Sequence, residues 1–164
     1  MDIALTRVDS RLVHGQVIES WVPALKATML LVADDLVARD TWRASIMKAC
    51  VPDGLRVEVT RVEELNALIE RGASSCERAL VLFSCVSDAI RAYDLGFFFE
   101  QLNLGNVHEH KNSRRISSTV YLSPDDLNGL RRLHEKGVLI EIRALSRDKP
   151  LRSADFLDRI EAGD

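Results

Sequence analysis

A single histidine stands within a short segment whose residue types suit phosphoryl transfer. The segment reads Arg7-Val8-Asp9-Ser10-Arg11-Leu12-Val13-His14-Gly15-Gln16-Val17. The apolar run before it predicts a buried strand, and apolar residues after it recur at helical spacing, so His14 falls at a strand-to-helix turn. In an open α/β sheet such turns line the crevice at the carboxyl ends of the strands, where backbone N–H groups face an anion. The spacing therefore predicts an anion site beside a histidine.

The polar residues around His14 have predicted roles in this chemistry. A nucleophilic histidine presents one neutral ring nitrogen and holds the other by a hydrogen bond, which Asp9 or a backbone carbonyl would accept. The transition state of phosphoryl transfer spreads negative charge over its oxygens, so guanidinium and amide donors stabilise it. The candidate phosphate ligands are Arg11 and the N–H groups of Gly15, Gln16 and Val17.

Three other positions are open to two interpretations each. Arg7 is either structural or part of the rim of the site, because side chains alternate along a strand. Ser84 ends the fourth predicted strand, where its hydroxyl either binds phosphate or only caps the strand end. Cys85 is an alternative nucleophile, although no neighbouring residue marks it as a thiolate.

The segment around His14 resembles the active-site loop of the IIB subunits of the mannose/fructose/sorbose family of the sugar phosphotransferase system. That loop reads Arg-hydrophobic-Asp-x-Arg-hydrophobic-hydrophobic-His-Gly-Gln-hydrophobic, and its histidine is the phosphorylated residue. The resemblance continues through residues 31–40, 102–108, 120–127 and 133–138 and so covers nearly the whole chain. The chain departs from the pattern at Ser10, where many members have an acidic residue, and at residues 108–112, which lack a glycine.

The resemblance implies a cytoplasmic phosphoryl carrier that accepts phosphate on His14 from a phosphohistidine of a IIA protein or domain. It would pass the phosphate to a sugar transported by membrane subunits IIC and IID, as a protein-phosphohistidine–sugar phosphotransferase that needs no metal or organic cofactor. A regulatory or degenerate relative that binds partners without phosphorylating sugar shares the same signature. An unrelated nucleotide-binding module is the third alternative, but the Gly-x-Gly-x-x-Gly and Walker patterns are missing from the sequence.

The composition agrees with a single cytoplasmic domain over residues 1–164. The chain has 164 residues, of which 46% are hydrophobic, which suits one buried core. A formal net charge of -3 argues against nucleic-acid binding, and the sequence has no apolar run of membrane-spanning length. It begins with a predicted strand rather than a signal peptide. The three cysteines are too widely spaced to suggest a disulfide framework or a zinc site.

Strand and helix patterns alternate along the chain. This alternation is typical of an open, doubly wound α/β fold with a mostly parallel sheet of about six to seven strands and helices on both faces. Predicted strands span residues 3–7, 29–33, 55–60, 79–84, 99–103, 118–122 and 138–143. Predicted helices span residues 17–25, 36–49, 62–69, 88–94 and 127–134. Ser87 is the expected cap of the fourth helix, and Gly72 and Gly137 are expected to end helices.

The longest polar stretch, residues 105–118, has three interpretations. It is a solvated loop, an active-site flap that brings Asn106 and His108 to the rim, or a metal site built on His108 and His110. The metal interpretation lacks a convincing third ligand. Asp34 and Asp35 are expected to cap a helix and to lie on the rim. The aromatic residues are candidates for either core or docking surface, and self-association of the chain stays open: Trp21, Trp42, Phe97, Phe98 and Phe99.

Overall fold

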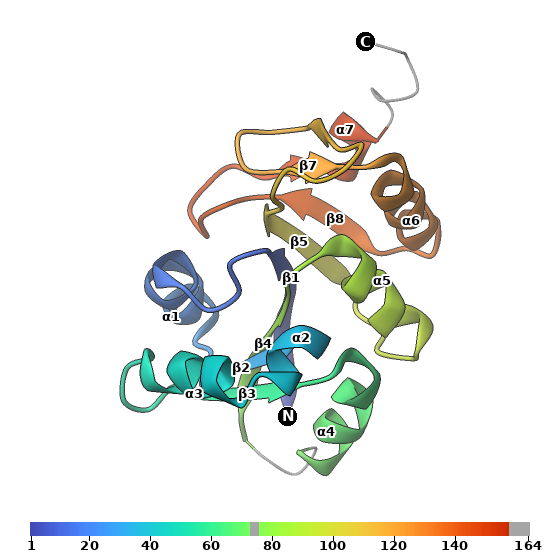
Figure 1. Ribbon diagram of the computed structural model, residues 1–164. Coiled ribbons are helices and arrows are strands. Elements are labelled where there is room, and N and C mark those ends of the chain that lie inside the picture. The colour runs from blue at the N-terminus through green and yellow to red at the C-terminus, as the bar shows by residue number, and fades with distance from the viewer. Residues whose placement is uncertain (73–75, 158–164) are drawn as a thin grey trace.

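The computed structural model describes residues 1–72 and 76–157. The domain expected from the sequence spans residues 1–164, so residues 73–75 and 158–164 of that prediction lie outside the described ranges. A seven-stranded sheet in the order β3-β2-β4-β1-β5-β8-β9 forms its centre (Figure 1). The strands are β1 (Asp2–Asp9), β2 (Met29–Ala33), β3 (Arg56–Thr60), β4 (Arg78–Phe83), β5 (Gln101–Asn106), β8 (Leu139–Ile142) and β9 (Leu151–Arg152). All neighbours pair in parallel except the edge strand β9, which is antiparallel to β8. The predicted α/β fold is confirmed.

Helices cover both faces of this sheet. They are η1 (Val17–Trp21, a π-helix), α1 (Val22–Leu25), α2 (Asp35–Arg39), α3 (Thr41–Ala49), η2 (Val62–Glu64, a 3-10 helix), α4 (Leu65–Arg71), α5 (Val86–Asp94), α6 (Pro124–Glu135) and α7 (Ser153–Phe156). Figure 1 shows α1 and α3 on one side of the sheet and α4, α5 and α6 on the other. Strands buried on both faces need continuous apolar sequence, and β2 and most of β4 are buried throughout.

The predicted strand at residues 118–122 does not join the main sheet. Its residues form β7 (Tyr121–Leu122), which pairs with β6 (Arg114–Arg115) in a separate two-stranded antiparallel sheet. The reason is that β8 occupies the place beside β5. The seventh strand of the main sheet is instead β9, which the sequence analysis did not predict.

Two helix predictions also need correction. The helix expected at residues 36–49 is divided into α2 and α3 by Asp40, whose backbone is not helical and whose side chain caps α3 by accepting the Arg43 N–H at 2.9 Å. The helix α5 begins after Cys85 without a side-chain cap, and Ser87 lies within its first turn. Ser87 therefore is not the N-cap. Asp34 does cap α2, because its carboxylate accepts the N–H groups of Leu36 and Val37.

The topology brings one end of β1 to the point where the chain changes direction across the sheet. The strand β1 lies between β4 and β5, the connection after β1 leads to β2, and the connection after β4 crosses back to β5. Loops at the carboxyl ends of strands around such a switch point form the usual ligand crevice of an open α/β sheet. Residues 10–16 lie in this position.

Candidate active site

The loop after β1 is held in one conformation by backbone contacts and by a buried side chain. Ser10 N–H donates to the Asn106 carbonyl at 2.8 Å, and Leu12 N–H donates to the Asp9 carbonyl at 2.8 Å. Leu12 has a left-handed backbone with φ of 56°, which is strained for a residue with a branched side chain, and its side chain is fully buried. Strain of this kind persists only where the surroundings impose it, as at functional loops.

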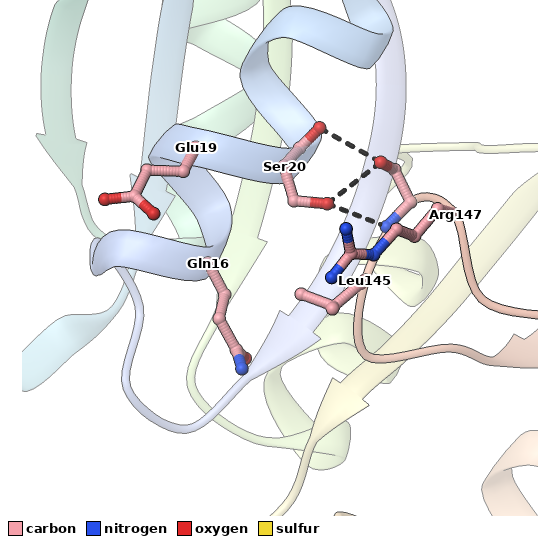
Figure 2. A pocket seen from close by; sticks show the side chains of 6 residues that line it. Gln16, Glu19, Ser20, Leu145 and Arg147 are labelled. Carbon is pink, nitrogen blue, oxygen red and sulfur yellow. Dashed lines mark hydrogen bonds between the residues drawn. The ribbon is translucent and has the colours of Figure 1, made fainter.

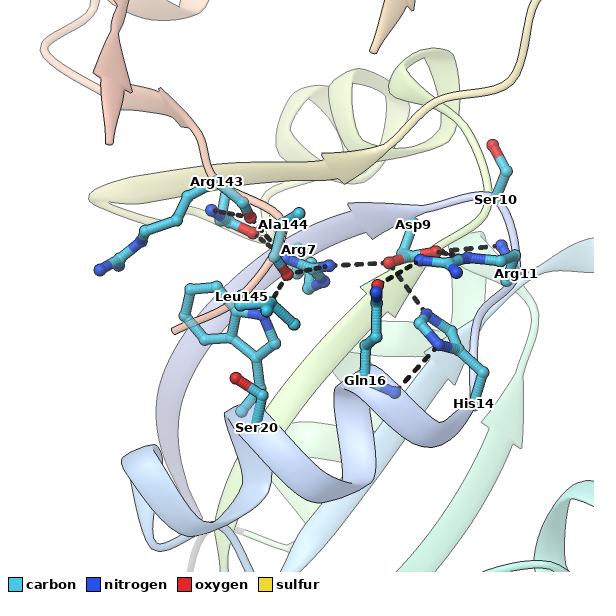
Figure 3. A network of polar contacts seen from close by, with 12 residues as sticks. Arg7, Asp9, Ser10, Arg11, His14, Gln16, Ser20, Arg143, Ala144 and Leu145 are labelled. Atoms are coloured by element: carbon cyan, nitrogen blue, oxygen red, sulfur yellow. Dashed lines mark hydrogen bonds and ion pairs between the residues drawn. The ribbon is translucent and has the colours of Figure 1, made fainter. Parts of the chain in front are cut away.

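His14 contacts two groups through its two ring nitrogens (Figure 3). Nε2 lies 3.1 Å from Asp9 Oδ2, a close ion-pair contact whose angles fall outside those of a hydrogen bond. Nδ1 accepts the Gln16 N–H at 3.3 Å. These contacts assign the ring proton of the neutral imidazole to Nε2 and leave the lone pair on Nδ1. The side chain is 17% exposed, so solvent reaches the ring only in part.

Asp9 is fully buried and is surrounded by cationic groups. Its carboxylate accepts from Arg7 Nη2 at 2.8 Å, from the Arg11 N–H at 3.2 Å and from Arg11 Nε at 3.3 Å. Burial opposes ionisation of this carboxyl group, but the contact with His14 and the charge of Arg7 outweigh it and hold its pKa below the usual value. Asp9 is therefore ionised at neutral pH and orients the histidine ring.

Arg7 is fully buried, so the possible place on the rim is wrong and the structural interpretation holds. Its guanidinium group donates to Asp9, to the carbonyls of Arg143 at 3.0 Å and Ala144 at 3.1 Å, and to Asn103 Oδ1. The guanidinium carbon lies 5.0 Å from the centre of the Trp21 ring. Burial lowers the pKa of Arg7. The side chain acts as the internal support of Asp9 and joins β1 to β5 and to the loop after β8.

Several residues of this buried network were missed by the sequence analysis. Gly105 lacks a Cβ that would collide with the Arg7 guanidinium, and Asn103 also donates to Glu141 Oε1 at 3.1 Å. Arg143 in turn donates to Glu141 at 2.7 Å. The one available signal was polar residues at alternate positions of β1, β5 and β8, which share a face of the sheet.

Arg11 and Gln16 lie at the exposed side of His14. Arg11 Nη2 donates to Gln16 Oε1 at 2.8 Å, and the Arg11 side chain is 36% exposed. The expected set of free N–H groups is smaller than predicted, because Val17 N–H donates to the His14 carbonyl at 3.0 Å and Gln16 N–H to the ring. Of the three predicted amides, the Gly15 N–H has no hydrogen-bond partner among the described residues. Of the predicted phosphate ligands in this loop, Arg11 and the Gly15 amide are therefore available to an anion.

The remaining predicted site residues lie around the edge of the loop. His108 is exposed, and its N–H donates to Ser10 Oγ at 3.2 Å, while Asn106 ends β5 beside Asp9. Ser84 follows β4, which neighbours β1, but its side chain makes no hydrogen bond to any described residue. Burial raises the pKa of the Cys85 thiol, which disfavours the thiolate form that a nucleophilic cysteine needs.

The loop over residues 105–118 is attached to α6 by a histidine. His110 Nε2 lies 2.9 Å from Asp126 Oδ2, and Asp126 also takes part in the capping box at Ser123. The His110 ring is therefore engaged with Asp126. In the described part of the chain, no three His, Cys, Asp or Glu side chains are grouped to hold a metal ion.

The candidate docking residues divide between core and surface. Trp21, Phe97 and Phe99 are buried, whereas Trp42 is 75% exposed and Phe98 is 74% exposed. Asp35 pairs with Arg91 at 2.7 Å and accepts the Val62 N–H at 3.0 Å.

No helix in the described ranges is long and apolar enough to span a membrane.

The fold and the site together define a class of protein. It is an α/β protein that presents a carboxylate-supported histidine and an arginine at the carboxyl edge of a parallel sheet, next to its switch point.

Comparison with known proteins identifies the family within this class. The family model described as "PTS system sorbose subfamily IIB component" matches residues 3–163. The sorbose-specific EIIB component of Lacticaseibacillus casei is 30% identical over 161 residues, which cover 98% of this chain and 96% of that protein. The crystal structure of the IIBSor domain of the sorbose permease from Klebsiella pneumoniae superposes with a TM-score of 0.88 at 27% identity, and covers 100% of this chain and 99% of that one. The chain belongs to the sorbose subfamily of phosphotransferase-system IIB components.

Some relatives are longer. The mannose-specific EIIAB component of Escherichia coli K12 is 27% identical over 161 residues, which are 98% of this chain and 50% of that protein. The chain therefore spans about half the length of such relatives.

Proposed function

We propose that this chain is a cytoplasmic phosphoryl carrier that accepts phosphate on His14 from a IIA phosphohistidine and passes it to a sugar transported by IIC and IID membrane subunits. The observation that carries the proposal is the asymmetry of the histidine ring. Nε2 faces the buried carboxylate of Asp9, whereas Nδ1 has its lone pair beside the donors of the loop. We therefore propose Nδ1 as the phosphorylated nitrogen.

Acceptance of phosphate uses the groups around the ring in a defined order. The Nδ1 lone pair attacks phosphorus, and the N–P bond of the donor histidine breaks and leaves its electron pair on the donor ring. The Gln16 N–H, which now donates to Nδ1, is released and can donate to a phosphoryl oxygen instead. Phosphorylation of Nδ1 with the proton kept on Nε2 makes the ring cationic, and the ionised Asp9 stabilises this charge.

Arg11 is the proposed electrostatic stabiliser of the transferred group. Its guanidinium exchanges the hydrogen bond to Gln16 for phosphoryl oxygens, which carry more negative charge than an amide oxygen. In the second transfer a sugar hydroxyl oxygen attacks phosphorus, and the N–P electron pair returns to Nδ1. Nδ1 then takes the proton that the hydroxyl group loses, so the step ends with a sugar phosphate and a protonated His14 beside Asp9.

Phosphorylation of wild type, His14→Ala and His134→Ala by phosphoenolpyruvate tests this function. The general phosphotransferase proteins and a mannose-family IIA are supplied, and the label is then treated with acid. We expect an acid-labile label on the wild type and on the His134 variant, whose histidine lies on α6 away from the loop, and none on the His14 variant. Label that survives in His14→Ala, or that resists acid, would contradict the proposal. Acid-labile label that never reaches sugar in vesicles containing IIC and IID would support the regulatory alternative.

A further inference from the structure

A row of polar side chains extends across the sheet from the candidate site towards the edge strand β9. Arg7 of β1 is the register partner of Asn103 of β5, and Asn103 is the register partner of Glu141 of β8. All three residues are buried. Arg7 Nη1 donates to Asn103 Oδ1, and Asn103 Nδ2 donates to Glu141 Oε1 at 3.1 Å. These three residues, the polar row, connect β1 to β8 through their side chains, and the proposed reaction steps use none of them.

Asp9 presents the same oxygen atom to His14 and to the polar row (Figure 3). His14 Nε2 lies 3.1 Å from Asp9 Oδ2, and Arg7 Nη2 donates to this Oδ2 at 2.8 Å. Arg11 Nε donates to the other oxygen, Oδ1. Because a cation at Oδ2 offsets part of the negative charge that the imidazole meets, the charge around Arg7 controls how strongly Asp9 favours a protonated ring. A change of charge in the polar row therefore acts on His14.

A second ion pair lies at the far end of the polar row. Glu141 Oε1 accepts from Arg143 Nη2 at 2.7 Å and from Arg143 Nε at 3.1 Å, in addition to Asn103 Nδ2. Asp9 and Glu141 together balance the charges of Arg7 and Arg143. Water and salt screen buried charges less than exposed ones, so the loss of either member of this pair would leave one unbalanced charge connected to Asp9.

Other charged groups lie on the segments around His14 and the polar row. Arg11 contacts Asp9 directly. The remaining groups form no ion pair with Asp9 or Glu141 in the described part of the chain: Glu19, His108, Arg147, Asp148 and Arg152. Asp148 is half-buried and accepts the Leu145 N–H at 2.8 Å, and the other four are exposed and therefore screened by solvent.

Arg143 also holds the loop that follows β8. Its Nη1 donates to the Ser146 carbonyl at 3.1 Å, and its own carbonyl accepts from Arg7 Nη1 at 3.0 Å. Ser146 in turn binds η1, because its N–H donates to Ser20 Oγ at 2.9 Å and its Oγ donates to the Ser20 carbonyl at 3.1 Å (Figure 2). The loop thus connects Arg143 both to the guanidinium beside Asp9 and to the helix that follows His14.

We propose that Glu141 and Arg143 are positioning residues for His14. They act through the polar row, which sets the charge that Asp9 presents to the imidazole. The inference rests on the proposed function, since acceptance of phosphate needs a neutral ring and the phosphorylated ring carries a positive charge. Glu141 favours the positive ring and Arg143 disfavours it, so the pair holds the two effects in balance without touching the reacting atoms.

A pH titration of the His14 ring signals by NMR, on the isotope-labelled and unphosphorylated chain, tests the proposal. The signals are assigned by their loss in His14→Ala. Glu141→Gln removes a negative charge and keeps the shape of the side chain, so the titration midpoint should move to lower pH by about 0.5 units or more. Arg143→Met removes a positive charge, so the midpoint should move to higher pH by a similar amount. The double variant restores the balance and should return to within about 0.2 units of the wild type.

The control variants Asp94→Asn and Arg132→Met remove the same two charges from an exposed ion pair between α5 and α6. We expect each to leave the midpoint within about 0.2 units of the wild type. A pair that is only structural would lower the free energy of unfolding in both Glu141→Gln and Arg143→Met, but it would not move the midpoint in opposite directions. The acid limb of the phosphorylation rate should move in the same directions as the midpoint, because the ring must be neutral to accept phosphate.

Three results would overturn the proposal: unchanged midpoints in both single variants, midpoints that move in the same direction, or a double variant no closer to the wild type than Glu141→Gln. If Arg143→Met does not fold, Glu141→Gln and the double variant still decide the outcome. The titration needs no phosphoryl donor, so its result is separable from that of the labelling experiment. Opposite shifts without phosphorylation of His14 would keep the electrostatic coupling and refute the carrier, and phosphorylation without these shifts would do the reverse.

Discussion

Replacement of Arg7 by methionine would test whether the buried arginine supports the site. The variant keeps a long side chain over Trp21 but removes the cation that contacts Asp9. Asp9 would then keep its charge in a fully buried position with Arg11 as the nearest remaining cation, 3.3 Å away. The carbonyls of Arg143 and Ala144 would lose their donor as well.

The magnitude follows from these contacts. Removing one partner of a buried ion pair costs about 3–5 kcal/mol, because the other charge stays buried. Since Arg11 still contacts Asp9, we expect a loss near the lower end, about 3 kcal/mol of the free energy of unfolding. For a domain of this size that corresponds to a fall in Tm of roughly 6–12 °C.

Urea denaturation of wild type, Arg7→Met, Asp9→Asn and the double variant measures the effect as a double-mutant cycle. The double variant no longer contains the uncompensated carboxylate, so we expect it to be more stable than Arg7→Met by about 1–2 kcal/mol. The double variant also keeps the test valid if Arg7→Met fails to fold. A loss below about 1 kcal/mol in Arg7→Met, or a double variant no more stable than Arg7→Met, would refute the reasoning.

Three other predictions concern the surroundings of the same site. The folded pKa of Asp9 lies below its unfolded value, so the contribution of this carboxylate to stability is present above about pH 4 and is lost as the pH falls through the folded pKa. Urea denaturation at a series of pH values should show this loss of stability. An equal loss in the Asp9→Asn variant would contradict the assignment to Asp9. Gly105→Ala should lower the free energy of unfolding by about 1–3 kcal/mol, because the added Cβ collides with the Arg7 guanidinium. Gly15→Ala should change that free energy by less than about 0.5 kcal/mol, because the nearest neighbour of its Cβ is 3.9 Å away. Similar thermal shifts in the two variants would argue against close packing at Gly105. Burial raises the pKa of Cys85, so at neutral pH iodoacetamide should alkylate this thiol more slowly than the two exposed cysteines. The Cys85→Ser variant should keep its acid-labile phosphoryl label. Loss of that label would indicate that the thiol takes part in phosphoryl transfer.

The residue types in one short segment made part of the candidate site predictable from the sequence. The string around His14 combines a nucleophile, a carboxylate and an arginine within one strand-to-helix turn, and all of these residues are close in sequence. Apolar runs and apolar residues with period 3.6 likewise predicted the main strands and the class of fold. A continuous apolar run suits a strand that is buried on both faces, and period 3.6 reports the buried face of a helix. Asp34 at the start of α2 was predictable for the same reason, since a cap bonds to residues only a few positions away.

Contacts between distant segments were decided by tertiary structure. Alternation along β1 places Arg7 and Asp9 on one face, but only the pairing with β5 and the position of the loop after β8 determine that Arg7 is buried. Asn103 and Ala144 lie far from Arg7 in sequence, so no local pattern links them to it. The exclusion of β7 from the main sheet depends in the same way on β8, which occupies the neighbouring position.

The contact between η1 and the loop after β8 shows the same division. Hydrogen bonds between Ser20 and Ser146 bring these two segments together across the fold, and no local pattern in the sequence links them. Periodicity and residue type describe what each segment can do alone. Which segments meet depends on the order of strands in the sheet, because that order sets which loops share an edge.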